Sequence, residues 1–493
     1  MEIDSVVVVD IDGLRPDVFL EAYQAGKLPN FERLFGGQKM VHGERVPALA
    51  PAPSITFASQ ACLFTGAHPS QHGIPGNQFF DRFGQHNGGK ARLYAFDMGD
   101  ALAVDDAVRV FVDGLASKCL QTATLYEKLS ARGWSSVVAS HMYALGADTW
   151  LRPSLIRLAR FTKGGSLFGM SAADYDGNTL KNTLEYLDKQ GLPDLLTVYF
   201  MGIDHESHAH GPQAQAGYLT EKLDGMVGEL CRAAEQAQPD SSRPFWILCS
   251  DHGQTSVPPD DRHSLRLAFP TEREMGGVFD ALGLDVNDFP GEDPNSNAVV
   301  AANGGLAYVY LQNRKGSWNA VPDFEGDVLS VARAFWEAHQ AGRYAPDLQG
   351  ALSGVLVRNV EQDGWRAGYR ALSQDGELLP LEHWFDGQQA GAYVDPVHRL
   401  DNLAGPMCGD LLLLSNYEEG FYFGAPQHGV HGGLNEEDSQ ALLLFGWPGA
   451  QANEWAQARD MFREAVNMRA QHEGGRQATT ADLVTGLLAL IGW

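Results

Sequence analysis

Short runs of apolar residues recur along the chain, and stretches with helical periodicity separate them. Such runs are typical of strands that are buried on both faces of a parallel sheet. Alternation of the two patterns predicts an α/β fold with a mostly parallel central sheet flanked by helices. The apolar runs are residues 5–10, 135–139, 194–201, 245–249 and 441–445, and the helical patterns are 17–36, 122–132, 215–234 and 479–491.

Residues 255–425 differ from the rest of the chain in their pattern of apolar and turn-forming residues. They combine loops rich in turn-forming residues with strand-like runs such as 306–311 and a helical pattern near 327–341. We therefore expect an inserted α+β subdomain, a cap that partly continues the core. The two parts of the core would then be residues 1–254 and 426–493.

The composition limits the kinds of molecule that we expect this protein to bind. The 493 residues include 36 basic and 62 acidic side chains, for a formal net charge of −26. This charge argues against a nucleic-acid duplex groove or an anionic membrane surface as the main partner. No apolar run approaches the ~18 residues that a transmembrane segment needs. A strand begins within five residues of the amino terminus, which leaves no room for a secretory leader. We expect a cytoplasmic protein, unless a leader was removed, and make no prediction about its oligomeric state.

The five cysteines show no paired short spacing, which favours buried, reduced thiols over a disulfide framework or a thiolate metal site.

Residues that could bind a metal ion or act in catalysis lie just after the apolar runs. Asp12 follows the first run, the pair Asp251-His252 follows the run at 245–249, and Thr56 ends a proline-rich loop before a helical stretch. Open α/β sheets place ligand sites at the carboxyl ends of their strands, so these side chains are expected to converge. The simpler alternative for Asp12 and for Thr56 is a helix N-cap. The full candidate set is Asp12, Thr56, Asp204, His208, Asp251, His252 and His431.

This set contains two groups of carboxylate and imidazole ligands. Mixed oxygen and nitrogen ligands suit zinc or another divalent transition metal better than magnesium or calcium. Two such ions about 4 Å apart are a recurrent arrangement for displacement at phosphorus. His68 and His72 are interpreted as loop-packing residues, and His205, His210 and His428 as structural groups near the site. His428 is also the alternative to His431 as the last ligand.

The same residues carry a resemblance to a known family. The chain resembles the alkaline phosphatase superfamily and, within it, the nucleotide pyrophosphatase/phosphodiesterase branch. The matching motifs are Asp12-Gly-Leu-Arg15, Pro53-Ser-Ile-Thr56-Phe57, Thr65-Gly66, Pro69, His72-Gly-Ile74, Asn77, Asp204, His208, Gly211-Pro212, Ser250-Asp-His-Gly253 and His431-Gly432.

The resemblance implies a three-layer sandwich and a role for each residue. Asp12, Asp251 and His252 would bind one zinc ion, which also contacts Thr56. Thr56 would attack phosphorus to form a phosphothreonine intermediate. The Asn77 amide and the backbone near Thr56 would hold the non-bridging oxygens. The second zinc ion would be bound by Asp204, His208 and His431.

A missing motif and missing positive charges distinguish this chain from other branches of the superfamily. The sulfatase motif Cys/Ser-x-Pro-x-Arg is absent from the sequence. Phosphomonoesterases and phosphonate hydrolases of the superfamily place cations where this chain has the uncharged stretch 138–146. A site without them suits a singly charged phosphodiester, unless Arg152 or Lys163 folds back to supply the charge.

The prediction is therefore a phosphodiesterase or nucleotide pyrophosphatase acting on a small-molecule phosphate ester. The alternatives are a phosphomonoesterase or phosphonate hydrolase and, third, a catalytically silent scaffold. Substrate specificity is expected to depend on residues 78–115, 145–176 and 255–425.

Overall fold

A seven-stranded sheet forms the centre of the larger part of the protein. The computed structural model describes residues 3–97, 104–161, 169–238, 243–267, 275–388 and 391–493. Strands β7, β6, β8, β1 and β9 are mutually parallel, whereas β22 runs antiparallel to β9 and β2 antiparallel to β22. The order across the sheet is β2 (Gly43–Arg45), β22 (Leu443–Gly446), β9 (Phe245–Cys249), β1 (Val6–Ile11), β8 (Leu195–Phe200), β6 (Ser136–Ala139) and β7 (Thr149–Leu151).

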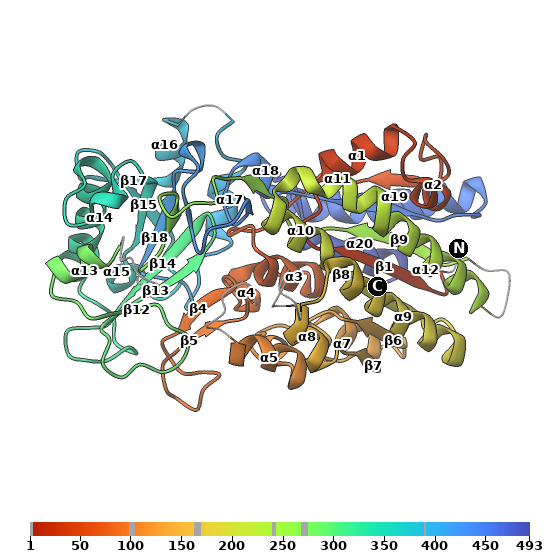
Figure 1. Ribbon diagram of the computed structural model, residues 1–493, viewed down its shortest axis with the longest axis horizontal. Helices are drawn as coiled ribbons and strands as arrows, with labels where there is room; N and C mark the ends of the chain where they lie inside the picture. The colour runs from red at the N-terminus through yellow and green to blue at the C-terminus, as the bar shows by residue number, and fades with distance from the viewer. Residues whose placement is uncertain (1–2, 98–103, 162–168, 239–242, 268–274, 389–390) are drawn as a thin grey trace.

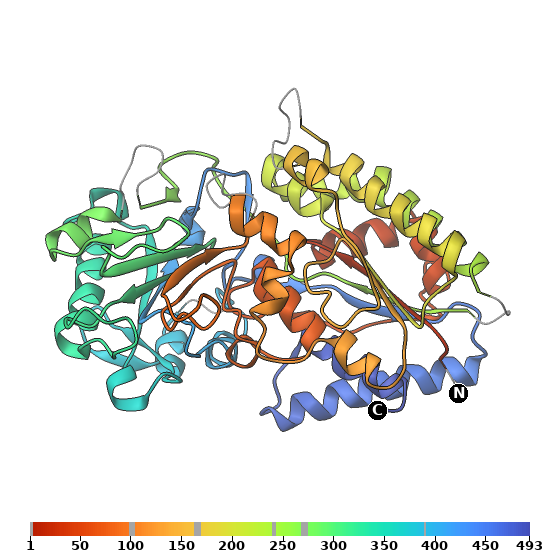
Figure 2. The ribbon, with the colours of Figure 1, turned by 90° about the horizontal axis from the view of Figure 1, so that it is seen from below.

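Helices cover both faces of this sheet, as Figures 1 and 2 show. Every residue of β1 is buried, because Val7 and Val9 pack into one hydrophobic cluster and Val6 and Val8 into another. The Val7 side packs against α1 (Pro16–Gln24), α2 (Pro29–Phe35), α9 (Ala172–Gln190) and α12 (Asp224–Gln236). The Val6 side packs against α3 (Thr56–Thr65), α7 (Leu125–Ser130), α19 (Ala452–His472) and α20 (Asp482–Leu490). The predicted α/β sandwich of three layers is confirmed.

Two predicted elements are divided in the structure. The helix expected at 17–36 is two helices, because Gly26 adopts a φ of 68° and Pro29 begins α2. The strand expected at 441–445 is also divided. Leu442 exchanges hydrogen bonds with Ser250, so the residues before it pair with another strand and the residues after it form β22.

Residues 286–415 contain a second seven-stranded sheet, which lies at the left of Figure 1. These strands form a sheet of their own instead of extending the central one. Strands β13, β14, β18, β15, β16 and β17 pair antiparallel in succession, whereas β12 runs parallel to β13. Helix α14 (Leu329–Ala341) packs against this sheet. The strands are, in order, β12 (Val286–Asn287), β13 (Ala298–Asn303), β14 (Leu306–Leu311), β18 (Leu411–Ser415), β15 (Leu352–Arg358), β16 (Tyr369–Leu372) and β17 (Leu378–Pro380). The division into a core of 1–254 and 426–493 and an insertion of 255–425 stays a prediction.

Shorter elements connect these layers. Among the described residues, no helix has the length and apolar composition needed to cross a membrane. The shorter strands are β3 (Ala48–Leu49), β4 (Gln78–Asp81), β5 (Arg92–Ala95), β10 (Thr255–Ser256), β11 (Ser264–Leu265), β19 (Tyr422–Phe423), β20 (Gly429–Val430), β21 (Gln440–Ala441) and β23 (Ala478–Thr479). The shorter helices are α4 (Pro69–His72), α5 (Val104–Val112), α6 (Leu115–Lys118), α8 (Leu155–Phe161), α10 (Gly202–His210), α11 (Gln215–Tyr218), α13 (Gly276–Ala281), α15 (Val360–Asp363), α16 (Leu381–Asp386), α17 (Pro396–Asp401) and α18 (Glu436–Ser439).

Candidate functional site

The carboxyl ends of three adjacent parallel strands bring the predicted residues together. Asp12 directly follows β1, Asp251 and His252 follow β9, and β8 leads into α10, which carries Asp204 and His208. Strands β9, β1 and β8 are neighbours, so their ends meet at one edge of the sheet. The short strand β20 brings the remaining predicted ligand, His431, to the same edge.

Asp12, Asp251 and His252 form the first group, and all three are buried. The Nε2 atom of His252 lies 3.3 Å from Asp251 Oδ2 and 3.6 Å from Asp12 Oδ1. One ligand atom from each residue lies within 4.8 Å of the other two, which is a spacing that a metal ion can bridge. The turn after β1 requires glycine at position 13. Gly13 has a φ of 66°, and an added Cβ would lie 2.8 Å from Asp204 Oδ1.

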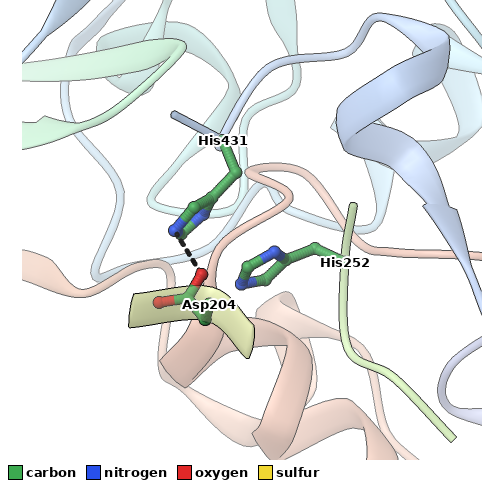
Figure 3. Close-up of side chains that lie close together, drawn as sticks. All are labelled: Asp204, His252 and His431. Atoms are coloured by element: carbon green, nitrogen blue, oxygen red, sulfur yellow. Dashed lines mark ion pairs between the residues drawn. The ribbon is translucent and has the colours of Figure 1, made fainter. Parts of the chain in front are cut away.

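Asp204, His208 and His431 form the second group beside the first. His208 Nε2 lies 3.2 Å from Asp204 Oδ2 and 3.2 Å from His431 Nε2, while His431 Nε2 lies 3.7 Å from Asp204 Oδ1. The groups adjoin, because the rings of His252 and His431 stack with centroids 3.8 Å apart. Figure 3 shows His252 and His431 with Asp204 beside them, and ligand atoms of these three also lie within 4.8 Å of one another.

All three imidazoles are oriented by backbone carbonyl groups. The Nδ1 atoms of His208, His252 and His431 lie 2.7, 2.9 and 3.2 Å from the carbonyl oxygens of Gly429, Gly253 and Ser54. When each ring is neutral, the proton on Nδ1 donates to the carbonyl, and Nε2 keeps a lone pair that can bind a metal ion. Metal-binding histidines are commonly held in this way.

Two carboxylate oxygens at the centre are buried and have no hydrogen-bond partner among the described residues. Asp12 Oδ1 and Asp251 Oδ2 accept no hydrogen bond from the described residues. Burial, followed by the charge of Asp251, raises the pKa of Asp12 well above its ordinary value. Burial also raises the pKa of Asp251. Clustered, desolvated carboxylates favour a bound cation, so the donor set fits a divalent metal.

In the second group, attraction between the carboxylate and the imidazoles outweighs the effect of burial on Asp204 and His208. Burial raises the pKa of Asp204, but the charges of His208 and His431 outweigh it, and the pKa lies below its ordinary value. Burial lowers the pKa of His208, but the ion pair with Asp204 outweighs it and raises the pKa to about 9. Burial, followed by the charge of His252, lowers the pKa of His431.

Thr56 is the first residue of α3, and its hydroxyl faces the centre. Its Oγ1 lies 3.2 Å from His252 Nε2. The N-cap position of α3 is held by Ile55, and that of α1 by Arg15, so the N-cap alternative for Thr56 and Asp12 is wrong. Asn77 is 4% exposed, and its Oδ1 accepts a hydrogen bond of 2.9 Å from the backbone N–H of Phe57.

The other histidines considered in the sequence analysis are not members of the two groups. His68 pairs with Glu473 and His72 is fully buried near Cys62, which fits the predicted packing role. His428 is exposed, whereas His431 lies in the cluster. His210 pairs with Glu206 at the end of α10, and His205 is half-buried on the same helix.

Cations expected in other branches of the superfamily are placed elsewhere. His141 in the stretch 138–146 is fully buried, and burial lowers its pKa to about 3. Arg152 Nη1 donates to the carbonyl of Val112, and its guanidinium lies over the ring of Trp150. Lys163 lies outside the described residues.

Sequence reasoning missed several residues that hold the ligands. The hydroxyl of Tyr199, inside β8, donates to Asp12 Oδ2, and Gln254 Nε2 donates to Asp204 Oδ1. The tip of the β13–β14 hairpin also contacts the site, because the Gly305 N–H donates to the His431 carbonyl at 3.1 Å, and Asn303 bonds both backbone groups of Gln78, the residue after Asn77. Gln254 directly follows the Ser-Asp-His-Gly motif and could have been found by that position, whereas Tyr199 resembles any strand residue.

Comparison with known proteins identifies the family. Residues 6–371 match the family model described as type I phosphodiesterase/nucleotide pyrophosphatase. The chain belongs to this family. An uncharacterized pyrophosphatase/phosphodiesterase of Schizosaccharomyces pombe is 26% identical over 266 residues, which cover 50% of this chain and 44% of the relative. The catalytic subunit of human GPI ethanolamine phosphate transferase 2 is 23% identical over 114 residues, covering 23% of this chain and 12% of the relative. These alignments therefore span less than half the length of either curated relative.

Solved structures share the family fold. Murine ectonucleotide pyrophosphatase/phosphodiesterase 5 superimposes with a TM-score of 0.54 and 15% identity, covering 91% of this chain and 90% of the other. An inactive threonine-to-alanine variant of the same protein, in complex with AMP, gives a TM-score of 0.57 and 14% identity, covering 99% and 95%. The predicted alkaline-phosphatase-like fold of this family member is confirmed.

Proposed function

We propose that this family member hydrolyses phosphodiester or pyrophosphate bonds, with Thr56 as the nucleophile and two zinc ions as cofactors. The observation that carries the proposal is the position of the Thr56 hydroxyl. It lies at the amino end of α3, 3.2 Å from His252 Nε2, and beside two adjoining groups of carboxylates and imidazoles.

The two groups define where the ions would bind. Asp12, Asp251 and His252 would hold the ion beside Thr56. Asp204, His208 and His431 would hold the other, which fits the adjoining geometry of the groups. When bound, such ions stabilise negative charge on the phosphoryl group and lower the pKa of the nucleophile.

The residues of the chain then perform two displacements. The Thr56 hydroxyl loses its proton to solvent as Oγ1 attacks phosphorus, and the bond from phosphorus to the leaving oxygen breaks. The leaving group takes up a proton from solvent, and a phosphothreonine that still carries the other ester group remains. Water then attacks the same phosphorus, the bond from phosphorus to Thr56 Oγ1 breaks, and a proton returns to Oγ1. The Asn77 carbonyl is occupied by the Phe57 N–H, which leaves the Asn77 amide N–H groups to hold a non-bridging oxygen. The Phe57 N–H therefore acts by orienting Asn77.

A diester is the favoured substrate because, among the described residues, neither His141 nor Arg152 brings a positive charge to the site. His141 is held neutral by burial, and Arg152 is engaged with Val112 and Trp150. The AMP bound to the related murine protein supports nucleotides as one substrate class. The proposed substrate is a small molecule. We also place the protein in the cytoplasm, which is supported by its five buried, unpaired cysteines.

The zinc-loaded protein is expected to turn over bis(p-nitrophenyl) phosphate with a kcat/KM at least about tenfold above that for p-nitrophenyl phosphate. Among the described residues, neither His141 nor Arg152 supplies a cation to match the extra negative charge of the monoester. Steady-state kinetics on both esters measure the ratio. A preference for the monoester would favour a phosphomonoesterase. A protein that binds no zinc and turns over neither ester would be a scaffold.

Zinc binding is expected to depend on pH through His208. Because its pKa is raised to about 9 in the metal-free protein, His208 carries a proton at neutral pH that zinc must displace. Zinc affinity at this group should rise about tenfold per pH unit between pH 6 and 8. Calorimetry in buffers of different ionisation enthalpy should show about one proton released per ion at this group. An affinity that does not change over this range would contradict the assignment.

A further inference from the structure

A buried arginine from the segment 255–425 reaches the loop that precedes Thr56. Arg399 lies in α17, near the boundary between the two parts in Figure 1, and is 2% exposed. Its Nε donates to the Ala50 carbonyl at 3.0 Å, and its Nη2 donates to the Pro51 carbonyl at 2.9 Å and to Ser54 Oγ at 2.6 Å. The guanidinium therefore holds the start of the nucleophile loop at three points.

The same guanidinium holds the segment that follows His431. Its Nη1 donates to Ser439 Oγ at 2.7 Å and lies 3.5 Å from the Leu434 carbonyl. Nη2 also lies 3.5 Å from the Gly433 carbonyl. A planar fork of five N–H donors can bind two segments at once, which a lysine ammonium cannot do with the same geometry.

Ser54 connects these contacts to the metal centre. Its hydroxyl accepts the Arg399 bond and donates to the Gly433 carbonyl at 3.0 Å. Its own carbonyl lies 3.2 Å from His431 Nδ1 and so orients that ring. Ser54 also stands two residues before Thr56 in the chain. A continuous path of hydrogen bonds therefore runs from Arg399 through Ser54 to His431.

The charge of Arg399 is costly where it lies. The structure shows no ion pair between Arg399 and a carboxylate among the described residues, and its partners are carbonyl and hydroxyl oxygens. Burial lowers the pKa of Arg399 to about 10. A buried cation with only neutral acceptors contributes less to stability than a paired one, so a role in fixing geometry accounts for it better.

We propose that Arg399, in the segment 255–425, is a positioning residue that fixes the nucleophile loop and His431 of the core relative to each other. The proposal rests on the function proposed above. Loss of the guanidinium fork should therefore disturb both the reach of Thr56 and the binding of the ion by His431, without altering any group that contacts substrate.

The chain offers a matched control in Arg358. This arginine is also fully buried in the segment 255–425, and it donates to the carbonyls of Gly405, Cys408 and Gly409 at 2.8, 2.7 and 2.9 Å. None of these acceptors belongs to the candidate ligands, to the nucleophile loop or to the segment 433–439 that Arg399 holds. Arg358→Lys and Arg399→Lys both keep the charge and lose the fork, so both should lower the midpoint of thermal unfolding.

Only Arg399→Lys is expected to affect the reaction. Its kcat on bis(p-nitrophenyl) phosphate should fall about 10- to 100-fold with little change in KM, and its affinity for the second zinc ion should fall by a similar factor. Arg358→Lys should match the wild type in both. Equal losses in the two variants, or none in Arg399→Lys, would overturn the proposal.

Two further measurements keep the test decisive. If Arg399→Lys does not fold, Ser54→Ala breaks the same path and should lower kcat and the affinity for the second zinc ion, whereas wild-type values would overturn the proposal. If the wild type binds zinc but turns over no ester, the proposed function fails, and the zinc affinities of the variants still decide the role of Arg399.

Discussion

Thr56→Ala is expected to lower kcat on bis(p-nitrophenyl) phosphate by about 10,000-fold or more, while both zinc ions remain bound. The substitution removes the one hydroxyl that lies 3.2 Å from His252 Nε2 at the start of α3. The carboxylates and imidazoles of the two groups are unchanged, so the metal content should be preserved. Stopped-flow absorbance for turnover and elemental analysis for zinc measure the two quantities.

Thr56→Ser is the matched control for this prediction. It keeps an attacking oxygen and removes only a methyl group, so it should retain turnover within about 100-fold of the wild type. Turnover by Thr56→Ala near the wild-type rate would place the nucleophile elsewhere. Loss of zinc from Thr56→Ala would instead mean that the hydroxyl is needed to hold the ions.

Asp251→Asn is expected to reduce the bound zinc from two ions to one and to lower turnover by about 1,000-fold or more. Asp251 Oδ1 accepts hydrogen bonds of 3.0 Å from the backbone N–H groups of Gly13 and His252. The asparagine carbonyl can keep both bonds. The change therefore replaces Oδ2, a buried oxygen that accepts no hydrogen bond from the described residues, with an amide nitrogen that does not bind metal.

Asp10→Asn separates metal binding from the general effect of altering a buried carboxylate. Asp10 lies in β1, two residues before Asp12, and is completely buried. Burial, followed by the charge of Asp251, raises its pKa well above the ordinary value. Asparagine has nearly the same size and shape as this side chain, so it is the closest replacement. This variant should bind two zinc ions. Retention of both ions by Asp251→Asn, or their loss from Asp10→Asn, would contradict the assignment.

The ligands could be predicted from the sequence because they lie next to recognisable strands. Asp12 and the pair Asp251-His252 follow apolar runs that form adjacent strands β1 and β9, so their convergence follows from parallel sheet geometry. The motifs around Thr56 and His431 supplied the rest of the set. The structure places all seven candidate residues at one edge of the sheet.

The residues that hold these ligands could not be predicted in the same way. Arg399 contacts Ser54 across 345 positions of sequence, and Asn303 contacts Gln78 across 225. No local pattern marks such pairs, because they depend on how the segment 255–425 folds against the core. Tyr199 is one apolar-flanked residue of a buried strand, and only the register of β8 beside β1 shows that its hydroxyl reaches Asp12.

The covalent step at Thr56 is the central claim and can be measured directly. Zinc-loaded protein is mixed with bis(p-nitrophenyl) phosphate, quenched with acid within the first turnover, digested and analysed by mass spectrometry. We predict that the peptide containing Thr56 carries one p-nitrophenyl phosphoryl group on that residue. An adduct on another side chain, or an unmodified Thr56 after one equivalent of nitrophenol has been released, would contradict the account.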